Sequence, residues 1–275
     1  MGVFDSGVGG LSVLRAIRAC LPYEALIYYA DSFYAPYGLR DDAFINARST
    51  AIAEWLIAQG AKAIVVACNT ATAQTIEHLR AILEVPVIGV EPGLKPAAEA
   101  SRSRQVGVLA TAATLRSRRF EQLLARFASQ CQFHCTAGLG LVEAIEAGEP
   151  NGRAVEALLR AYLEPMLAAG VDTLVLGCTH YPFARETIER VSAGQLTIID
   201  TGEAIARQLA HRLDECAATA APRGSAVAPR LLSSSDGRQL SAIASSLLGE
   251  TLHATHQTIP FAAPASEASA GPSAT

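Results

Sequence analysis

Two cysteines stand at the ends of two similar apolar segments of the chain. The segment AQGAKAIVVACNT (58–70) aligns without a gap to AAGVDTLVLGCTH (168–180), at an offset of 110 residues. Each copy reads as a helix end, a glycine turn and an apolar strand that ends at Cys68 or Cys178. Short apolar strands resemble one another by chance, but the matched terminal cysteines indicate two related half-domains, each with one thiol.

Paired thiols of this kind suit proton transfer on both sides of one carbon atom. A cysteine just before a helix N-terminus faces the positive end of the helix dipole, so we expect its pKa to be lowered. If Cys68 and Cys178 face each other across a ligand, one removes a proton while the other delivers one, which inverts the carbon. The predicted reaction is therefore racemisation or epimerisation. Asp5 and His180 are candidates to tune the thiols, although such residues often serve as a helix cap or a structural histidine.

Metal and other thiol chemistry are weaker interpretations. Cys68, Cys178 and His180 could supply three zinc ligands, but the usual ligand spacing is missing. The run CQFHC (131–135) has closer spacing but no second ligand pair near it, and buried, inert thiols are the preferred interpretation. A cysteine hydrolase leaves one thiol unused, and a redox pair more typically has the pattern Cys-x-x-Cys. We predict no metal.

The glycine-rich segment GVFDSGVGGLSV (2–13) raises the possibility of a dinucleotide site. Asp31 follows at roughly the expected interval of ~20 residues, but the third glycine of the fingerprint would fall on Ser12. We interpret the loop as a tight turn whose backbone N–H groups and Ser6 hydroxyl approach a small anion at a helix N-terminus.

Pyridoxal phosphate, the usual electron sink in amino-acid racemisation, needs a lysine for its Schiff base. The chain contains only Lys62 and Lys95. Lys62 precedes its strand, at the wrong end for the site, whereas Lys95 follows a Pro-Gly turn and is less easily excluded. We predict a reaction without a cofactor.

The thiols need a scaffold that presents strand ends to a common site. Apolar β-rich runs alternate with helical stretches, which is typical of βαβ units with parallel strands. Helices over 42–59 and 155–169 stop at Gly60 and Gly170, which are plausible C-caps. In open α/β sheets the ligand binds at the carboxyl ends of the strands, where both thiols are expected. The predicted strands cover 25–29, 63–67, 85–90, 106–109, 173–177, 196–199 and 231–232.

Composition restricts the class of partner. The chain has 275 residues, half of them hydrophobic, and a net charge of -4. It has no basic cluster for a nucleic acid and no basic amphipathic helix for a membrane surface, so we expect a small-molecule partner. The first residues do not read as a signal peptide and no apolar run reaches spanning length, so we expect a cytoplasmic protein with free thiols at all six cysteines.

Five segments, taken together, resemble the glutamate racemases of the aspartate/glutamate racemase superfamily. The match runs in order from Gly2 to about Gly249, and its segments are GVFDSGVGGLSV (2–13), PYG (36–38), VVACNTAT (65–72), PVIGVEPG (86–93) and LVLGCTHYP (174–182). The resemblance implies cofactor-independent, two-base interconversion of L- and D-glutamate, which supplies D-glutamate for peptidoglycan. Aspartate racemase is the nearest alternative within the superfamily, and a non-catalytic amino-acid-binding module is the alternative from another class.

The resemblance also implies roles for individual residues. Cys68 would deprotonate D-glutamate with help from Asp5, and Cys178 would deprotonate L-glutamate with help from His180. The segment CTAGLGLVE (135–143) resembles a family stretch that ends in an acidic residue beside the second thiol, which nominates Glu143, although the prolines usual in that stretch are absent. Hydroxyl, amide and backbone N–H groups can hold the two substrate carboxylates. The implied substrate contacts are Asp5, Ser6, Tyr37, Gly38, Asn69, Thr70, Thr179 and His180.

For the fold, the resemblance and the strand pattern predict two Rossmann-like or flavodoxin-like α/β domains. Each has a central parallel sheet, the two are pseudo-symmetric, and the active site lies at their interface. Residues 1–92 and 201–261 would form the domain with Cys68, and 93–200 the domain with Cys178, so that two crossings form a hinge. Residues 262–275 read as a disordered tail. Bacterial relatives imply self-association, for which a homodimer is one expected form.

Overall fold

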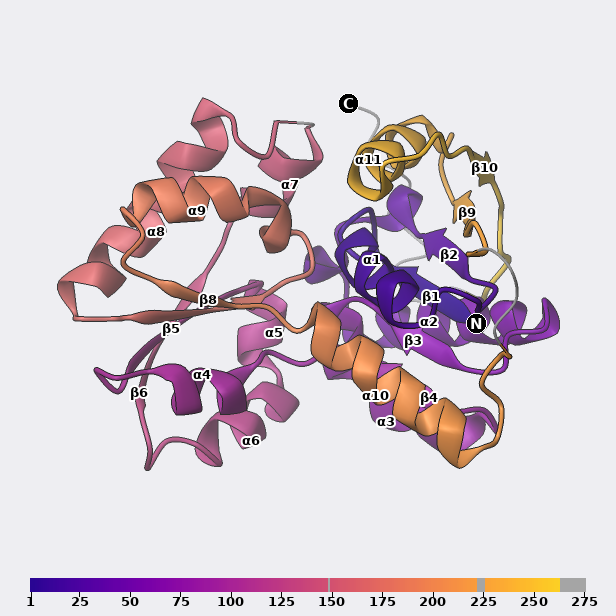
Figure 1. The fold of residues 1–275 in the computed structure, drawn as a ribbon, viewed down its shortest axis with the longest axis horizontal. Helices are drawn as coiled ribbons and strands as arrows, with labels where there is room; N and C mark the ends of the chain where they lie inside the picture. Colours follow the sequence, from indigo (N-terminus) through magenta and orange to yellow (C-terminus); the bar gives the residue numbers. More distant parts are fainter. Residues whose placement is uncertain (148, 222–225, 263–275) are drawn as a thin grey trace.

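The computed structural model describes residues 1–147, 149–221 and 226–262. It contains two β-sheets side by side, each covered by helices on both faces (Figure 1). We call the six-stranded sheet with its helices the large lobe, and the four-stranded sheet with its helices the small lobe. The tail predicted from residue 262 lies, from 263 onward, outside the described residues.

All strand pairs in both sheets are parallel, so the predicted α/β fold is confirmed. The strand order is β10-β9-β2-β1-β3-β4 in the large lobe and β6-β5-β7-β8 in the small lobe. The order β2-β1-β3-β4 therefore repeats as β6-β5-β7-β8, which is the predicted pseudo-symmetry. The strands are β1 (Gly2–Asp5), β2 (Ile27–Ala30), β3 (Ile64–Val66), β4 (Val87–Gly89), β5 (Gln105–Ala110), β6 (Gln132–Ala137), β7 (Thr173–Gly177), β8 (Thr197–Ile199), β9 (Arg230–Ser233) and β10 (Ala254–His256).

The central strands are buried on both faces because helices cover both sides of each sheet. Every residue of β1, β3 and β7 is buried, and these strands are mostly continuous apolar runs, as expected for covered parallel sheets. β3 and β7 occupy equivalent places in the two lobes, each next to the strand that begins its lobe. The repeat seen in the sequence therefore places Cys68 and Cys178 beyond the carboxyl ends of two equivalent strands.

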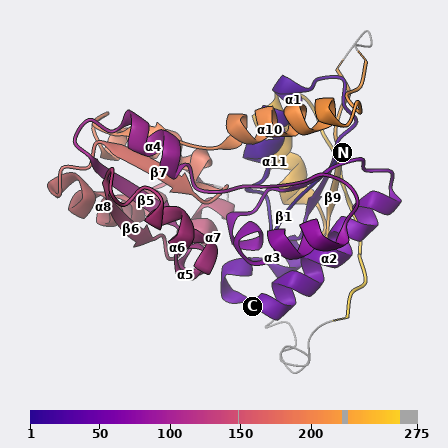
Figure 2. The same cartoon turned by 90° about the horizontal axis from the view of Figure 1, so that it is seen from below.

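Different helices cover the two faces of each sheet. In the large lobe α1 and α10 lie on one face and α2 and α3 on the opposite face (Figure 2). In the small lobe α7, α8 and α9 lie on one side of the sheet, and α4, α5 and α6 on the other (Figure 1). The bounds are α1 (Leu11–Cys20), α2 (Asp42–Ala58), α3 (Asn69–Ile82), α4 (Leu94–Ala100), α5 (Ala112–Arg116), α6 (Arg118–Ala125), α7 (Leu141–Glu146), α8 (Arg153–Ala168), α9 (Arg185–Val191), α10 (Gly202–Glu215) and α11 (Arg238–Leu248), with 3-10 turns η1 (Ser32–Tyr34), η2 (Tyr37–Leu39) and η3 (Tyr181–Ala184).

Two glycines end long helices as predicted. Gly60 follows α2 with a φ of +88°, and Gly170 follows α8 with a φ of +79°. Side chains with a Cβ rarely adopt this left-handed conformation, so glycine is the residue that allows each helix to turn back into its strand. Each turn leads to the strand that carries one of the two cysteines.

The chain passes between the sheets twice. The large lobe takes its strands from residues 2–89 and 230–256, and the small lobe takes its strands from 105–199. The predicted domain boundaries at 92 and 200 fall in the connections between β4 and β5 and between β8 and α10, and they stay predictions. In the described part of the chain, no helix combines the length and the apolar character that a membrane span requires.

Candidate active site

A cavity of about 90 Å³ lies at the carboxyl ends of β3 and β7, between the two lobes. One water needs ~10–15 Å³ measured in this way, so the cavity has room for a small ligand. The predicted site residues lie in its wall, except Asp5, which is fully buried behind Ser6. Among its lining residues are Ser6, Tyr37, Gly38, Cys68, Asn69, Thr70, Glu143, Cys178, Thr179 and His180.

Cys68 connects β3 to α3 and is the N-cap of that helix. The Ala71 backbone N–H donates to Cys68 Sγ at 3.4 Å, and the thiol donates to Ser6 Oγ at 3.7 Å. Burial and then the Asp5 carboxylate nevertheless raise the pKa of Cys68 to about 12. The expectation of a lowered pKa was therefore wrong for Cys68, because the loss of water outweighs the helix terminus. Cys68 carries its proton at neutral pH.

Cys178 follows β7 and has a different neighbour. It precedes η3, a single 3-10 turn, so the argument from an α-helix dipole does not apply to it. Its Sγ lies 3.7 Å from His180 Nδ1. Although burial lowers the pKa of His180, hydrogen bonds with Cys178 and Glu146 raise it well above its ordinary value. The positive charge of the His180 imidazolium therefore lies directly beside the Cys178 sulfur.

Glu146 is a site residue that the sequence did not predict. Its Oε1 accepts a hydrogen bond from His180 Nε2 at 2.7 Å and another from the Val8 backbone N–H at 3.4 Å. Although burial opposes ionisation, the bond and the charge of His180 hold the pKa of Glu146 below its ordinary value. Glu143, which the resemblance nominates, lines the cavity one helical turn earlier in α7, and its role stays a prediction. The spacing of three residues, which puts both acids on neighbouring positions of a helix surface, could have signalled Glu146.

The glycine loop before α1 brings the two lobes into close contact. A Cβ added at Gly7 would overlap Glu146 Oε1, and a Cβ added at Gly9 would overlap His180 Nδ1. The Gly7 N–H donates to Asp5 Oδ1 at 2.8 Å, while the next N–H in the chain donates to Glu146. These two N–H groups are therefore occupied by carboxylates of the protein, so the interpretation of the loop as an anion site was wrong for them. The glycines serve close packing instead.

Asp5 joins the lobes beneath the cavity. It accepts a hydrogen bond from Thr179 Oγ1 at 2.8 Å and one from Ser6 Oγ at 3.2 Å. Burial raises the pKa of Asp5, and the positive charge of His180 opposes this. Its connection to Cys68 runs through the Ser6 hydroxyl, so Asp5 acts on that thiol through charge and through Ser6.

Tyr37 contributes its backbone and ring rather than a free hydroxyl. Its side chain is 1% exposed, and the hydroxyl donates to Asp31 Oδ2 at 2.6 Å. Beside Gly38, Thr70 Oγ1 lies 3.0 Å from Thr111 Oγ1, so a hydroxyl of each lobe faces the other. The cavity thus offers hydroxyl, amide and backbone groups from both lobes.

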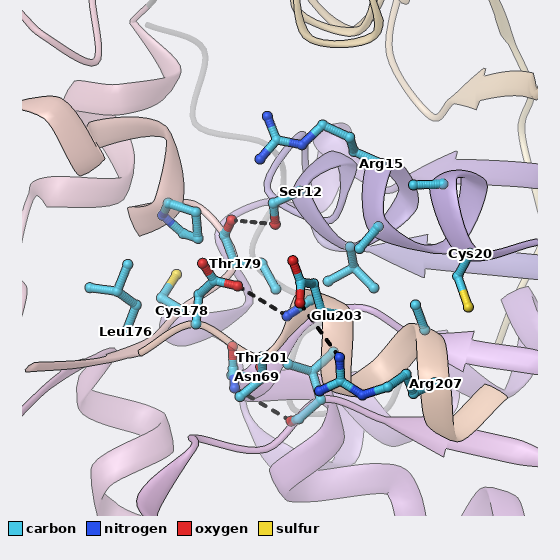
Figure 3. A pocket seen from close by; sticks show the side chains of 18 residues that line it. Ser12, Arg15, Cys20, Asn69, Leu176, Cys178, Thr179, Thr201, Glu203 and Arg207 are labelled. Atoms are coloured by element: carbon cyan, nitrogen blue, oxygen red, sulfur yellow. Dashed lines mark hydrogen bonds and ion pairs between the residues drawn. The ribbon is translucent and has the colours of Figure 1, made fainter. Parts of the chain in front are cut away.

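A larger hollow of about 570 Å³ adjoins the site between α1 and α10 (Figure 3). Cys178 and Thr179 border both spaces, and the Ser12 hydroxyl donates to the Thr179 carbonyl at 3.0 Å. Cys68 lines only the smaller cavity. The smaller cavity is therefore the one in which both thiols can reach a single ligand.

The two proposed zinc sets are not assembled as metal centres. Among the described residues, no group of three or more His, Cys, Asp or Glu side chains is arranged to hold a metal ion. Cys131 is buried, as expected, whereas Cys135 is exposed, so the expectation of a buried thiol was wrong for Cys135. His134 Nε2 lies 2.7 Å from Gln105 Oε1, which gives this ring a structural partner.

Known proteins resemble this chain in sequence and in fold. Residues 10–209 match the family described as Asp/Glu/hydantoin racemase. A glutamate racemase of Cupriavidus pinatubonensis is 57% identical over 248 residues, which cover 90% of this chain and 91% of the relative. A solved glutamate racemase isoform of Bacillus anthracis has a TM-score of 0.85 at 31% identity, covering 94% of this chain and 97% of its own. The Escherichia coli glutamate racemase, solved with L-glutamate and the activator UDP-MurNAc-Ala, has a TM-score of 0.82 at 34% identity, covering 95% and 98%.

Proposed function

The chain belongs to the Asp/Glu/hydantoin racemase family and, within it, to the glutamate racemases, and from this premise we propose that it interconverts L- and D-glutamate by proton transfer between two cysteines. The observation that carries the proposal is that Cys68 and Cys178 line one cavity from the two lobes. Each thiol follows the equivalent strand of its own sheet. The substrate carbon would lie between them.

The two thiols differ in a way that suits the reaction. Cys68 holds its proton, because burial and Asp5 raise its pKa to about 12. Cys178 instead has the His180 imidazolium 3.7 Å from its sulfur, a charged partner that Cys68 lacks. The proposed roles follow this difference: toward L-glutamate Cys178 serves as the base and Cys68 as the acid, the combination that general acid–base catalysis requires.

From L-glutamate, the Cys178 thiolate removes the α-proton. The Cα–H bond breaks, an S–H bond forms, and the electron pair remains on Cα in conjugation with the adjacent carboxylate. The Cys68 thiol then delivers its proton to the opposite face, which gives D-glutamate and leaves a Cys68 thiolate. The return reaction uses the same groups in reverse. We propose that no cofactor takes part.

The lining groups support recognition of an amino acid with two carboxylates. Hydroxyls of Ser6, Thr70 and Thr179 and the amide of Asn69 surround the thiols. Such groups hold carboxylates by hydrogen bonds and leave the thiols free to act. Both cysteines are about one-twentieth exposed, so little water reaches the reacting carbon, where preorganised donors stabilise developing charge most strongly.

We further propose that the product serves peptidoglycan synthesis, as the family resemblance implies. The cytoplasmic location and the homodimer expected from the sequence stay predictions. Fractionation of the producing cell would test the location, and analytical ultracentrifugation of the purified protein would test the homodimer, both separately from catalysis.

Each glutamate enantiomer, incubated with the protein in deuterated water without added cofactor, tests the proposal. We expect both samples to reach the same racemic mixture with deuterium at Cα, and aspartate to react much more slowly. Activity retained by the double variant Cys68→Ala/Cys178→Ala would contradict the two-thiol mechanism. Binding without deuterium incorporation would instead identify a non-catalytic module, and faster turnover of aspartate would identify an aspartate racemase.

A further inference from the structure

The wall of the cavity near Cys68 includes a loop whose position depends on a buried ion pair. Tyr37 and Gly38 line the cavity, and the Tyr37 hydroxyl donates to Asp31 at 2.6 Å. We call residues 31–39 the site loop. Asp31 is fully buried, so the site loop is anchored from inside the large lobe rather than from its surface.

Arg48 of α2 is the charged partner of Asp31. Its Nε donates to Asp31 Oδ2 at 2.8 Å and its Nη2 donates to Oδ1 at 2.7 Å, which is a two-pronged contact. Nη2 also donates to the Tyr29 hydroxyl at 3.0 Å. The side chain of Arg48 is 1% exposed. A buried pair of this kind holds its geometry only when the remaining donors also find partners.

The last described segment of the chain supplies the remaining partner. We call residues 257–261 the strap; it follows β10 and runs alongside α2 (Figure 2). The Ile259 carbonyl accepts a hydrogen bond from Arg48 Nη1, and Ile259 is itself buried. The Gln257 carbonyl accepts from the Tyr29 hydroxyl at 3.0 Å. The strap therefore contacts both the guanidinium and its tyrosine neighbour.

Phe261 covers the guanidinium from outside. Its ring centre lies 5.0 Å from Arg48 Cζ, within the range of a cation–π contact. The same ring meets Tyr34 of the site loop at 5.5 Å and Phe44 of α2 at 5.3 Å, both edge-on. Phe261 thus touches Arg48 and the site loop together, and separates the ion pair from water on that side.

We propose that the strap is a positioning element for substrate binding, acting through Arg48 and Asp31 on Tyr37 and the site loop. The proposal rests on the proposed function, because it assigns the effect to glutamate binding. The contact chain links the end of the described chain to the cavity wall in three steps: strap to Arg48, Arg48 to Asp31, and Asp31 to Tyr37. Loss of the strap should loosen the site loop while the hydrogen bonds of both thiols stay in place.

The main test is Phe261→Ala. We expect KM to rise roughly threefold to tenfold, the loss that one aromatic contact typically causes, and kcat to stay within about twofold, because Tyr37 and Gly38, which line the cavity, would contact substrate and transition state alike. Since L- and D-glutamate have equal free energies, kcat/KM must fall equally in both directions. Phe261→Tyr keeps the ring and should keep the wild-type KM. An unchanged KM in Phe261→Ala overturns the proposal.

Phe33→Ala is the matched control. Phe33 belongs to the same site loop, is 54% exposed and meets Tyr34 at 4.9 Å, edge-on like Phe261. Phe33 does not line the cavity, so the KM of Phe33→Ala should match that of the wild type. A rise in KM as large as that of Phe261→Ala would show a general effect of ring loss from this loop and would contradict a role specific to the strap.

A double-mutant cycle tests the route. Tyr37→Phe removes the hydroxyl that joins the site loop to Asp31, so its effect on KM should not add to that of Phe261→Ala. Additive effects contradict the route. Hydrogen exchange of residues 31–39 gives a readout without substrate: it should quicken in Phe261→Ala and not in Phe33→Ala. If the wild type lacks racemase activity, the proposed function fails. Unchanged hydrogen exchange of residues 31–39 in Phe261→Ala would contradict the positioning role of the strap, whatever the activity of the wild type.

Discussion

Glu146 Oε1 and His180 Nε2 are joined by a hydrogen bond of 2.7 Å, and the other ring nitrogen of His180 faces Cys178 Sγ at 3.7 Å. A carboxylate, an imidazolium and a sulfur thus stand in one row on the small-lobe side of the cavity. On the opposite side, Cys68 has only Ser6 and a backbone N–H as hydrogen-bond partners among the described residues, with the Asp5 carboxylate nearby. The two related half-domains therefore surround equivalent thiols with opposite electrostatics.

The first prediction concerns Glu146→Gln. Glu146 raises the pKa of His180, so its loss should lower that pKa. The imidazolium exists only below its pKa, and activity should therefore decline at a lower pH on the alkaline side of the profile. The measurement is kcat/KM against pH, together with NMR titration of the His180 ring. We expect kcat/KM at the optimum to fall by about tenfold or more, as is typical when a general acid–base pair loses its support.

Glu143→Gln is the comparison for that experiment, because the two acids occupy the same short helix. An alkaline limb that moves in Glu143→Gln and stays in place in Glu146→Gln would assign the acidic role to Glu143. That outcome would contradict the support of His180 by Glu146.

The second prediction concerns thiol reactivity. Because burial and Asp5 raise the pKa of Cys68, alkylation by iodoacetamide near pH 8 should modify Cys68 more slowly than the exposed cysteines. Asp5→Asn removes a negative charge, lowers the pKa of Cys68 and should speed its alkylation. Peptide mapping by mass spectrometry separates Cys68 from the other cysteines. Equal alkylation rates of Cys68 in the wild type and in Asp5→Asn would contradict the conclusion that Asp5 raises the pKa of Cys68.

The positions of both thiols could be predicted from the sequence because they depend on local order. A glycine turn, an apolar strand and a cysteine occur together in each half, and parallel sheets bring such strand ends to one edge. The pKa of Cys68 could not be predicted, because it depends on how deeply two lobes bury the thiol. Glu146 was missed for a similar reason, since its contact with His180 forms only when α7 packs beside η3.

Two edge strands were also missed. β6 has the sequence QFHCTA, and its residues are half-buried or exposed, so it lacks the continuous apolar run that identified the central strands. β10 has only three residues, Ala254–His256. Edge strands face water on one side and carry a weaker pattern, and their pairing is decided by the neighbouring strand. The strap that follows β10 could not be inferred without knowing that this segment joins the large sheet.

The third prediction separates stability from catalysis. Burial raises the pKa of Asp172, but hydrogen bonds from Ser101, Ser103 and their neighbours hold this pKa at about 2, below the ordinary 3.8. A lowered folded-state pKa stabilises the fold above the unfolded pKa, and this stability is lost as pH falls from about 4 to about 2. Asp172→Asn should therefore lower Tm at pH 7 by a few degrees, with a smaller difference near pH 3. Activity per folded molecule should not change, and a Tm deficit that is equal at both pH values would contradict the assignment.

The fourth prediction tests the close contact between the lobes at the glycine loop. In Gly9→Ala the new methyl group would overlap His180 Nδ1 and lie 2.7 Å from Thr179 Oγ1, so the turn carrying Cys178 has to move. Because displacement of a reacting group by about 1 Å can cost 10²-fold, we expect kcat/KM to fall by that order while the protein stays folded. Gly202→Ala is the control, since its nearest neighbours lie at an ordinary 3.5 Å. Circular dichroism and kinetics on both variants decide the point: wild-type activity in Gly9→Ala would show that the lobes can separate there without disturbing the thiols.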